Sequence, residues 1–245
     1  MLTDELTASG RWLFRWRSYL PLLMAPLLLV GVLLFHYPQG RHSLDVEWEG
    51  VSFGISLLGL IVRIATVGFV TQGSSGRETK SLRAEIFNTT GMYSVVRHPL
   101  YLGNFLVALG ILFDDGTWYI VTIGSLIYWL YYERIMVAEE GVLAERHGDA
   151  FRTWAASTPA FIPRFSQWRP PLVGFSVRTA IRREYATFFM IICVFTALEV
   201  ADDYEVLHHI HFDPLWGGVF LSSVTFYLVT RFLAKRTKLL EVPGR

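Results

Sequence analysis

Six apolar segments, each close to the length of a membrane span, are the feature that most constrains the fold of this chain. A transmembrane helix needs about 20 mostly apolar residues, and fewer where amphipathic side chains flank its ends. The segments comprise residues 19–35, 51–70, 100–113, 117–132, 186–201 and 214–232. Because only 18% of the residues are charged, the chain is too poor in charge for an ordinary soluble domain. The sequence therefore predicts an all-α integral membrane protein with about six transmembrane helices.

Positive charges are distributed unevenly between the two sides of these predicted spans. All of the 22 Lys and Arg residues except Arg41 and Arg63 lie before the first segment, in residues 71–99, in residues 133–185 or at the C-terminal end. The intervening loops carry acidic residues instead. Lys and Arg are retained on the cytoplasmic side during insertion. Both termini are therefore expected to be cytoplasmic, at the inner membrane of a bacterium or the endoplasmic reticulum of a eukaryote.

The third and fourth segments are short, and only Asp114, Asp115 and Gly116 separate them. Such a connection predicts a tight antiparallel helical hairpin. Two polar clusters that flank the hairpin, residues 91–104 and 133–165, would then meet on the cytoplasmic side. Taken separately, the first cluster is also typical of an interfacial anchor and the second of a solvated helix face. Together they predict a cytoplasmic cofactor-binding pocket at the lipid boundary.

Three short motifs in these clusters carry a family resemblance. The pattern Arg-His-Pro-x-Tyr-x-Gly occupies residues 97–103, a Glu-Glu pair stands at 139–140, and an Ile-Pro pair closes the segment at 162–163. In this order and spacing they resemble the isoprenylcysteine carboxyl methyltransferase and phospholipid methyltransferase superfamily, over about residues 55–165. The upstream stretch Ser75-Gly76-Arg77 also resembles it.

The resemblance implies that S-adenosylmethionine is the cofactor. The residues that it implies for cofactor binding are Val95, His98, Leu100, Tyr101, Gly103, Glu139, Glu140 and Pro163. Neighbouring residues on a helix point about 100° apart. We therefore expect only one of the two glutamates to face the site, while the other meets solvent or a basic partner.

Methyl transfer is an in-line displacement at a sulfonium methyl group. The protein therefore mainly aligns the two reactants and excludes water from the site. An arginine would orient an anionic acceptor, and a base would take the proton of an amine acceptor. The catalytic candidates on these grounds are Arg97, His98, Arg152 and Arg164. We expect the methyltransferase core in residues 1–185, and an additional C-terminal pair of transmembrane helices in residues 186–245.

The sequence thus favours methyl transfer from S-adenosylmethionine to a lipophilic acceptor embedded in the membrane. NADPH-dependent sterol and steroid reductases share the motif at 97–103, but their second cluster usually reads Asp-x-x-Cys before Lys-Tyr-Gly, and this chain has no cysteine there. A non-enzymatic membrane carrier is the third alternative. The expected partners are the membrane and a lipid or lipophilic small molecule, and no nucleic acid.

Two polar features lie outside these motifs. Apart from Arg231 at the end of the last segment, Arg63 is the one basic residue within a predicted span. It is either a functional or paired residue, with Glu133 as the hypothetical partner, or a snorkelling side chain. The histidines of the last outer loop, His208, His209 and His211, have no helical spacing that would orient them toward a metal ion. A solvated loop is the simpler interpretation, and no metal ligand is assigned.

Overall fold

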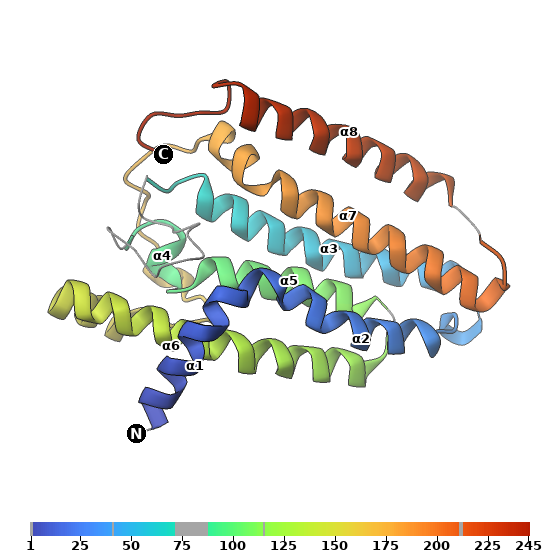
Figure 1. Ribbon diagram of the computed structural model, residues 1–245, viewed down its shortest axis with the longest axis horizontal. Coiled ribbons are helices and arrows are strands. Elements are labelled where there is room, and N and C mark those ends of the chain that lie inside the picture. Colours follow the sequence, from blue (N-terminus) through green and yellow to red (C-terminus); the bar gives the residue numbers. More distant parts are fainter. Residues whose placement is uncertain (1, 41, 72–87, 115, 211–212) are drawn as a thin grey trace.

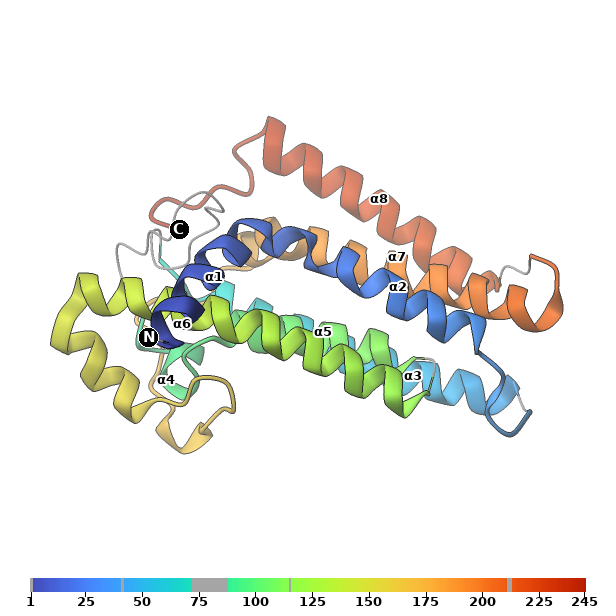
Figure 2. The same cartoon turned by 60° about the horizontal axis from the view of Figure 1, so that its bottom comes forward.

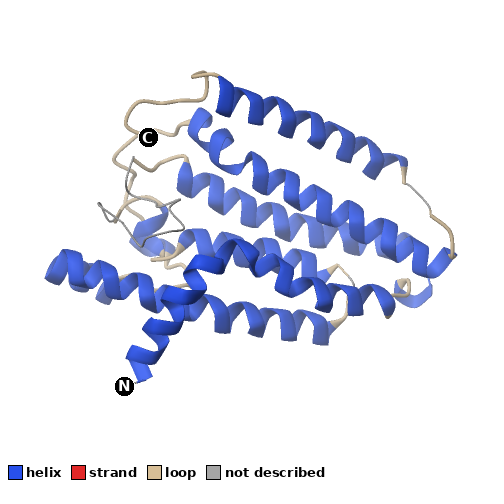
Figure 3. Ribbon diagram, viewed as in Figure 1, coloured by secondary structure: helices blue, strands red, loops and turns tan. Residues whose placement is uncertain are grey.

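The computed structural model describes residues 2–40, 42–71, 88–114, 116–210 and 213–245, which form helices and connecting loops without a β-strand (Figure 3). The helices are α1 (Leu2–Trp16), α2 (Leu20–Leu33), α3 (His42–Val67), α4 (Met92–Val95), α5 (Pro99–Phe113), α6 (Trp118–Ser157), α7 (Val177–Leu207) and α8 (Pro214–Arg236). Short 3₁₀ turns lie at Arg17–Tyr19, Pro38–Gly40 and Phe165–Gln167. The predicted all-α class is confirmed for these residues.

The long helices lie side by side in an elongated bundle (Figure 1). Helix α3 packs against α5 and α7, α6 packs against α1 and α5, and α8 packs against α7. Both chain termini lie at the end of the bundle that also holds α4, here called the motif end (Figures 1 and 2). This arrangement fits an even number of membrane crossings. That the motif end faces the cytoplasm stays a prediction from the charge distribution.

Three helices are long and apolar enough to cross a membrane, namely Leu44–Val67 within α3, Val177–Leu207 and Pro214–Arg236. Helices α1 and α2 meet at a bend of 58° and add a fourth crossing if they form one broken span. Helix α5 is apolar but has only 15 residues, about 22 Å at 1.5 Å per residue, which is shorter than a hydrocarbon core of about 30 Å. These helices fit membrane integration, and the total of about six spans stays a prediction.

The predicted hairpin after Phe113 is present. Helices α5 and α6 pack against each other and run in opposite directions (Figure 2). At the turn, the Gly116 amide donates to the Phe113 carbonyl at 3.1 Å, and Gly116 adopts a φ of +63° that favours glycine. The Trp48 indole donates to the same carbonyl at 2.7 Å and stacks on the Phe113 ring. Asp115 lies outside the described residues.

Glycines let α3 and α5 approach closely near the motif end. A Cβ atom added to Gly103 would lie 2.5 Å from Arg63 Cγ and 2.9 Å from the Gly59 carbonyl oxygen. One turn further on, Ser56 Oγ donates to the Val107 carbonyl at 2.9 Å. Small residues allow such close packing between membrane helices. Gly103, which the resemblance implies for cofactor binding, therefore has a packing role in the fold.

The substitution Gly103→Ala is expected to destabilise the protein, because the new methyl group would collide with the Arg63 stem and the Gly59 backbone. Overpacking costs about 1–3 kcal/mol, which for a chain of this length lowers the melting temperature by roughly 2–10 °C. Gly54→Ala on α3 is the matched control, since nothing lies within 4 Å of its added Cβ. Thermal unfolding of both variants in one detergent checks the prediction; equal melting temperatures would contradict it.

Helix α7 shares a hydrophobic core with α3 and α5. Its residues Ile191, Phe195 and Leu198 pack in one buried cluster with Leu60 of α3 and Ile111 of α5. The C-terminal helices are therefore joined to the core through buried apolar surface as well as through the chain.

Candidate functional site

The segment before α5 pairs with residues 158–164, here called the strap, which follow α6. The Arg97 and His98 amides donate to two strap carbonyls at 2.8 and 3.2 Å. In return, the Arg164 amide donates to the Val95 carbonyl at 2.9 Å. A proline then begins α5, a position where its missing N–H leaves no helical bond unmade. The Arg-His-Pro motif and the closing Ile-Pro pair are therefore held together by the backbone.

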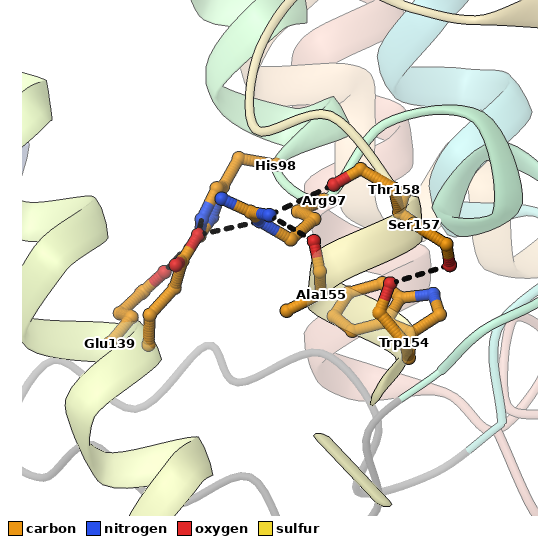
Figure 4. A network of polar contacts seen from close by, with 8 residues as sticks. Arg97, His98, Glu139, Trp154, Ala155, Ser157 and Thr158 are labelled. Atoms are coloured by element: carbon orange, nitrogen blue, oxygen red, sulfur yellow. Dashed lines mark hydrogen bonds and ion pairs between the residues drawn. The ribbon is translucent and has the colours of Figure 1, made fainter. Parts of the chain in front are cut away.

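His98 lies at the centre of a polar cluster (Figure 4). Its side chain is buried, with Nε2 2.8 Å from Glu140 Oε1 and Nδ1 3.7 Å from Glu139 Oε2. The Tyr101 hydroxyl donates to Glu139 Oε1 at 2.7 Å. The first and second motifs, far apart along the chain, thus meet around one imidazole ring.

Both glutamates contact this cluster, so the expectation that only one would face it is wrong. The expected basic partner is present, because Glu140 pairs with Arg97. Neighbouring helix positions do diverge. His98 lies between the two side chains, however, and its ring nitrogens are on different edges of the ring, so each nitrogen meets a different carboxylate.

Arg97 connects the cluster to the end of α6 by hydrogen bonds (Figure 4). Its Nε donates to Glu140 Oε1 at 2.8 Å, and its Nη1 donates to the carbonyls of Ala155 at 2.5 Å and Thr158 at 2.9 Å. A guanidinium group holds its N–H donors in fixed directions within one plane. Arg97 therefore fixes three partners at once: Glu140, the last turn of α6 and the start of the strap.

The pKa values of the two glutamates are shifted in opposite directions. Burial raises the pKa of Glu139, and His98 and Tyr101 offset this effect only in part. Burial acts in the same direction on Glu140, but its interactions with His98 and Arg97 outweigh it and hold the pKa of Glu140 below the ordinary value. Glu140 is therefore the more firmly ionised of the two.

The lowered pKa of Glu140 makes the stability of the protein depend on pH. Because the folded state favours the carboxylate, its contribution is fully present above the ordinary pKa of 4.5 and is lost as the pH falls through the lowered pKa. As the pH falls below 4.5, the melting temperature of the wild type is expected to fall more steeply than that of Glu140→Gln. Melting curves of both proteins at neutral and acidic pH check this; a difference that is constant with pH would contradict it.

Two of the four catalytic candidates are not brought into the cluster. The Arg152 side chain is 70% exposed on α6 and pairs with Asp149 at 3.3 Å. The Arg164 side chain is exposed, and its contact with the motif segment is through its backbone amide. Leu100 and Pro163 are partly buried, in the first turn of α5 and in the strap.

Arg17 contacts the cluster, although the sequence did not identify it. Helix α1 packs against α6, and the Arg17 Nη1 atom lies 3.9 Å from Glu139 Oε1. The Arg17 guanidinium also lies 3.8 Å from the centre of the Phe14 ring. The available signal was the group of basic and aromatic residues before the first apolar segment, which indicated topology but no partner.

Buried tyrosines continue from the cluster into the bundle. The Tyr101 ring lies 4.8 Å from the Tyr132 ring, which stacks on Tyr128 at 4.3 Å. The Tyr128 hydroxyl donates to the Tyr101 carbonyl at 2.7 Å. Aromatic faces beside carboxylates are suited to a cationic ligand.

A polar cavity of about 150 Å³ adjoins the strap. Its lining residues are Thr89, Ser94, Trp154, Ser157, Thr158, Gln167 and Arg169. Thr158 also binds Arg97 through its carbonyl, so the cavity lies next to the polar cluster. The buried Gln167 Oε1 atom has no hydrogen-bond partner, and such an acceptor is suited to a ligand that brings its own donor.

Arg63 is paired, but not with Glu133. Its Nε and Nη2 atoms donate to the two carboxylate oxygens of Glu184 at 2.7 and 3.0 Å. Glu184 belongs to α7, and the spacing of charges along the chain contains no information on which helix packs beside α3. The predicted partner was therefore wrong, and the paired alternative was correct.

No group of three or more His, Cys, Asp or Glu side chains in the described part of the chain could hold a metal ion. His209 Nδ1 lies 2.9 Å from the Leu207 carbonyl oxygen. His211 and the stretch Ser75-Gly76-Arg77 lie outside the described residues.

Residues 51–150 match the protein family described as phospholipid methyltransferase. The chain is also 26% identical over 127 residues to a protein-S-isoprenylcysteine O-methyltransferase of Schizosaccharomyces pombe, covering 46% of this chain and 54% of the relative. No solved structure matches the chain significantly.

Two further relatives are bacterial proteins named for metal resistance. The chain is 34% identical over 147 residues to a nickel-cobalt-cadmium resistance protein of Alcaligenes xylosoxydans xylosoxydans, covering 58% of this chain and 64% of the relative. It is 32% identical over 157 residues to a cobalt-zinc-cadmium resistance protein of Cupriavidus metallidurans, covering 63% of this chain and 64% of the relative. The matched region thus spans less than two thirds of each of these relatives.

Proposed function

Because this chain belongs to the isoprenylcysteine carboxyl methyltransferase and phospholipid methyltransferase superfamily, we propose that it transfers a methyl group from S-adenosylmethionine to a lipophilic acceptor in the membrane. The family supports a membrane methyltransferase. The identity of the methyl donor and the class of the acceptor are what we propose. The observation that carries the proposal is the convergence of Glu139 and Glu140 on His98 at the motif end.

The side chains at the motif end fit S-adenosylmethionine. The Glu139 side chain is 24% exposed, and a carboxylate there can accept from ribose hydroxyls or an amino group. Gln167 Oε1 offers a buried acceptor in the neighbouring cavity. When bound, S-adenosylmethionine supplies an electrophilic methyl group on a positively charged sulfur.

The protein's own contribution is orientation and, for some acceptors, proton transfer. Arg97 holds Glu140 and the strap in one geometry, and Glu140 fixes the His98 ring through Nε2. Alignment of reacting groups removes about 7–11 kcal/mol of barrier in the best intramolecular reactions. An amine, thiol or phenol acceptor releases a proton, which His98 can take; a carboxylate or phosphate acceptor releases none.

Exposed apolar side chains on the strap and just after it support an acceptor that arrives from the lipid. Ile162 and Phe165 are 80% and 68% exposed. The Phe161 ring packs edge-on against Phe105 of α5 and Trp129 of α6. Apolar surface of this kind beside a polar cluster is suited to a molecule with an apolar body and a polar reacting group.

Membranes that contain the full chain, incubated with methyl-labelled S-adenosylmethionine, test the proposal. A labelled lipid product that forms with the wild type and not with Glu139→Gln supports it. Label found only in water-soluble compounds would rule out a lipophilic acceptor. Calorimetric titration of the purified protein separates the alternatives, because binding of NADPH alone favours a reductase and binding of neither compound favours a carrier.

A further inference from the structure

One charged pair lies within helices that are long and apolar enough to span the membrane. Arg63 of α3 and Glu184 of α7 form a bidentate ion pair, with Nε–Oε2 and Nη2–Oε1 distances of 2.7 and 3.0 Å. The side chain of Glu184 is 4% exposed and that of Arg63 is 16% exposed. Arg63 lies inside the predicted span 51–70, and Glu184 lies just before the predicted span 186–201. An ionisable side chain within a span is costly, so by default Arg63 indicates a function.

Arg63 also contacts the helix that carries the first motif. Its Nη1 donates to Asn104 Oδ1. Its Cγ atom packs so closely on Gly103 that a Cβ added there would lie only 2.5 Å away. Asn104 in turn interacts with the Tyr132 hydroxyl on α6. Arg63 therefore connects α3, α5 and α7 at one point and reaches α6 through Asn104.

Tyr132 continues these contacts to the polar cluster. Its ring lies 4.8 Å from the Tyr101 ring, and the Tyr101 hydroxyl donates to Glu139 at 2.7 Å. An unbroken series of side-chain contacts thus runs from Glu184 of the C-terminal helix pair to the glutamate proposed to bind the methyl donor.

We propose that Glu184 is a positioning residue for methyl transfer, acting through Arg63 and Asn104 on the tyrosines beside the cluster. The kinetic part of this inference rests on the proposed function. Without Glu184, Asn104 would be the one hydrogen-bond partner left to Arg63 among the described residues. A buried charge that loses its partner is strongly unfavourable, so Arg63 would move toward other polar groups and displace Asn104 and Tyr132.

The inference assigns a role to the C-terminal helix pair. Glu184 lies outside residues 51–150, which match the methyltransferase family. Arg63 lies inside that segment, and its charge is neutralised from outside it. The matched segment alone would therefore contain an unpaired charge next to the site, and α7 completes the arrangement.

The test uses the full chain, purified in lipid nanodiscs, with the variants Glu184→Gln and Arg63→Met/Glu184→Met. Glu241→Gln is the matched control, because Glu241 also faces an arginine, Arg182 at 3.8 Å, but is exposed. For each protein, thermal unfolding, methyl-donor affinity, kcat and KM are measured. Hydrogen exchange over peptides covering residues 97–104 and 128–140 is measured without ligand.

Glu184→Gln is expected to remain folded and bind the donor within about threefold of the wild type, while its kcat falls at least about tenfold. Hydrogen exchange over residues 97–104 is expected to be faster in Glu184→Gln and unchanged in Glu241→Gln. The double variant replaces the pair with apolar groups, which should restore stability but not kcat. Recovery of kcat in the double variant, or a loss in Glu184→Gln that merely follows the folded fraction, would show that the pair is only structural.

The exchange experiment separates failure of this inference from failure of the proposed function. A wild type that neither binds nor uses the methyl donor would refute the proposed function. The hydrogen-exchange rates would then still show whether loss of Glu184 disturbs the residues that connect it to Glu139. Unchanged exchange over both peptides in Glu184→Gln would overturn the positioning role whatever the activity.

Discussion

Replacing Glu140 with glutamine is expected to lower the rate of the proposed methyl transfer at least about a hundredfold. The Oε1 atom of Glu140 accepts from Arg97 Nε and is bound to His98 Nε2, both at 2.8 Å. Hydrogen bonds to charged groups contribute about 1.5–3 kcal/mol each, and about 1.4 kcal/mol corresponds to a tenfold change in rate. A neutral amide weakens both interactions, so the alignment of His98 with the strap is lost.

Glu145→Gln is the matched control for this prediction, because Glu145 lies on the same helix and is exposed. Initial rates at saturating methyl donor are compared after correction for the folded fraction by circular dichroism. A Glu140→Gln protein that keeps more than about a tenth of the wild-type rate, beside an unaffected Glu145→Gln, would refute the central role of this carboxylate.

Arg97→Lys is expected to lower both the rate and the stability, even though the positive charge is kept. Arg97 uses Nε for Glu140 and Nη1 for the carbonyls of Ala155 and Thr158. An ammonium group cannot present donors in the same planar arrangement, so the strap loses part of its attachment. Loss of about 2–3 kcal/mol lowers the melting temperature by roughly 5–10 °C, and the rate is expected to fall about a hundredfold.

Arg146→Lys controls for the exchange of arginine for lysine, because Arg146 is exposed on the same helix. Differential scanning fluorimetry and the methyl-transfer assay are run on both variants. If Arg97→Lys melts and reacts like Arg146→Lys, the planar geometry of the guanidinium is irrelevant and charge alone suffices.

The meeting of the two motifs could be predicted because it depends on a local feature. The connection after Phe113 is too short for anything but a reversal, and a reversal places the start of α5 beside the middle of α6. The motif residues were found for the same reason, since His98, Glu139 and Glu140 belong to short patterns that are readable without the fold. What the patterns could not give was the direction of each side chain, so the shared contact of both glutamates with His98 was missed.

Contacts between side chains of helices that are distant in sequence could not be predicted from the sequence. Arg17 contacts Glu139 because α1 packs on α6, and Glu184 contacts Arg63 because α7 packs on α3. Gly103 belongs to a motif, yet its immediate neighbours are Arg63 and the backbone of α3. In each case the partner lies on a helix distant in sequence, and hydrophobicity alone does not specify which apolar helices become neighbours.

The amino-acid sequence by itself determined the helical class and the positions of the motifs, and its apolar segments indicated a membrane environment. It could do so because apolar length, charge placement and turn length are local quantities that act through the solvent and the backbone. Only the tertiary structure decided which charged and polar side chains pair, namely Glu140 with Arg97 and His98, and Glu184 with Arg63. Those pairings depend on distances of a few ångströms between helices, and such distances are set by packing.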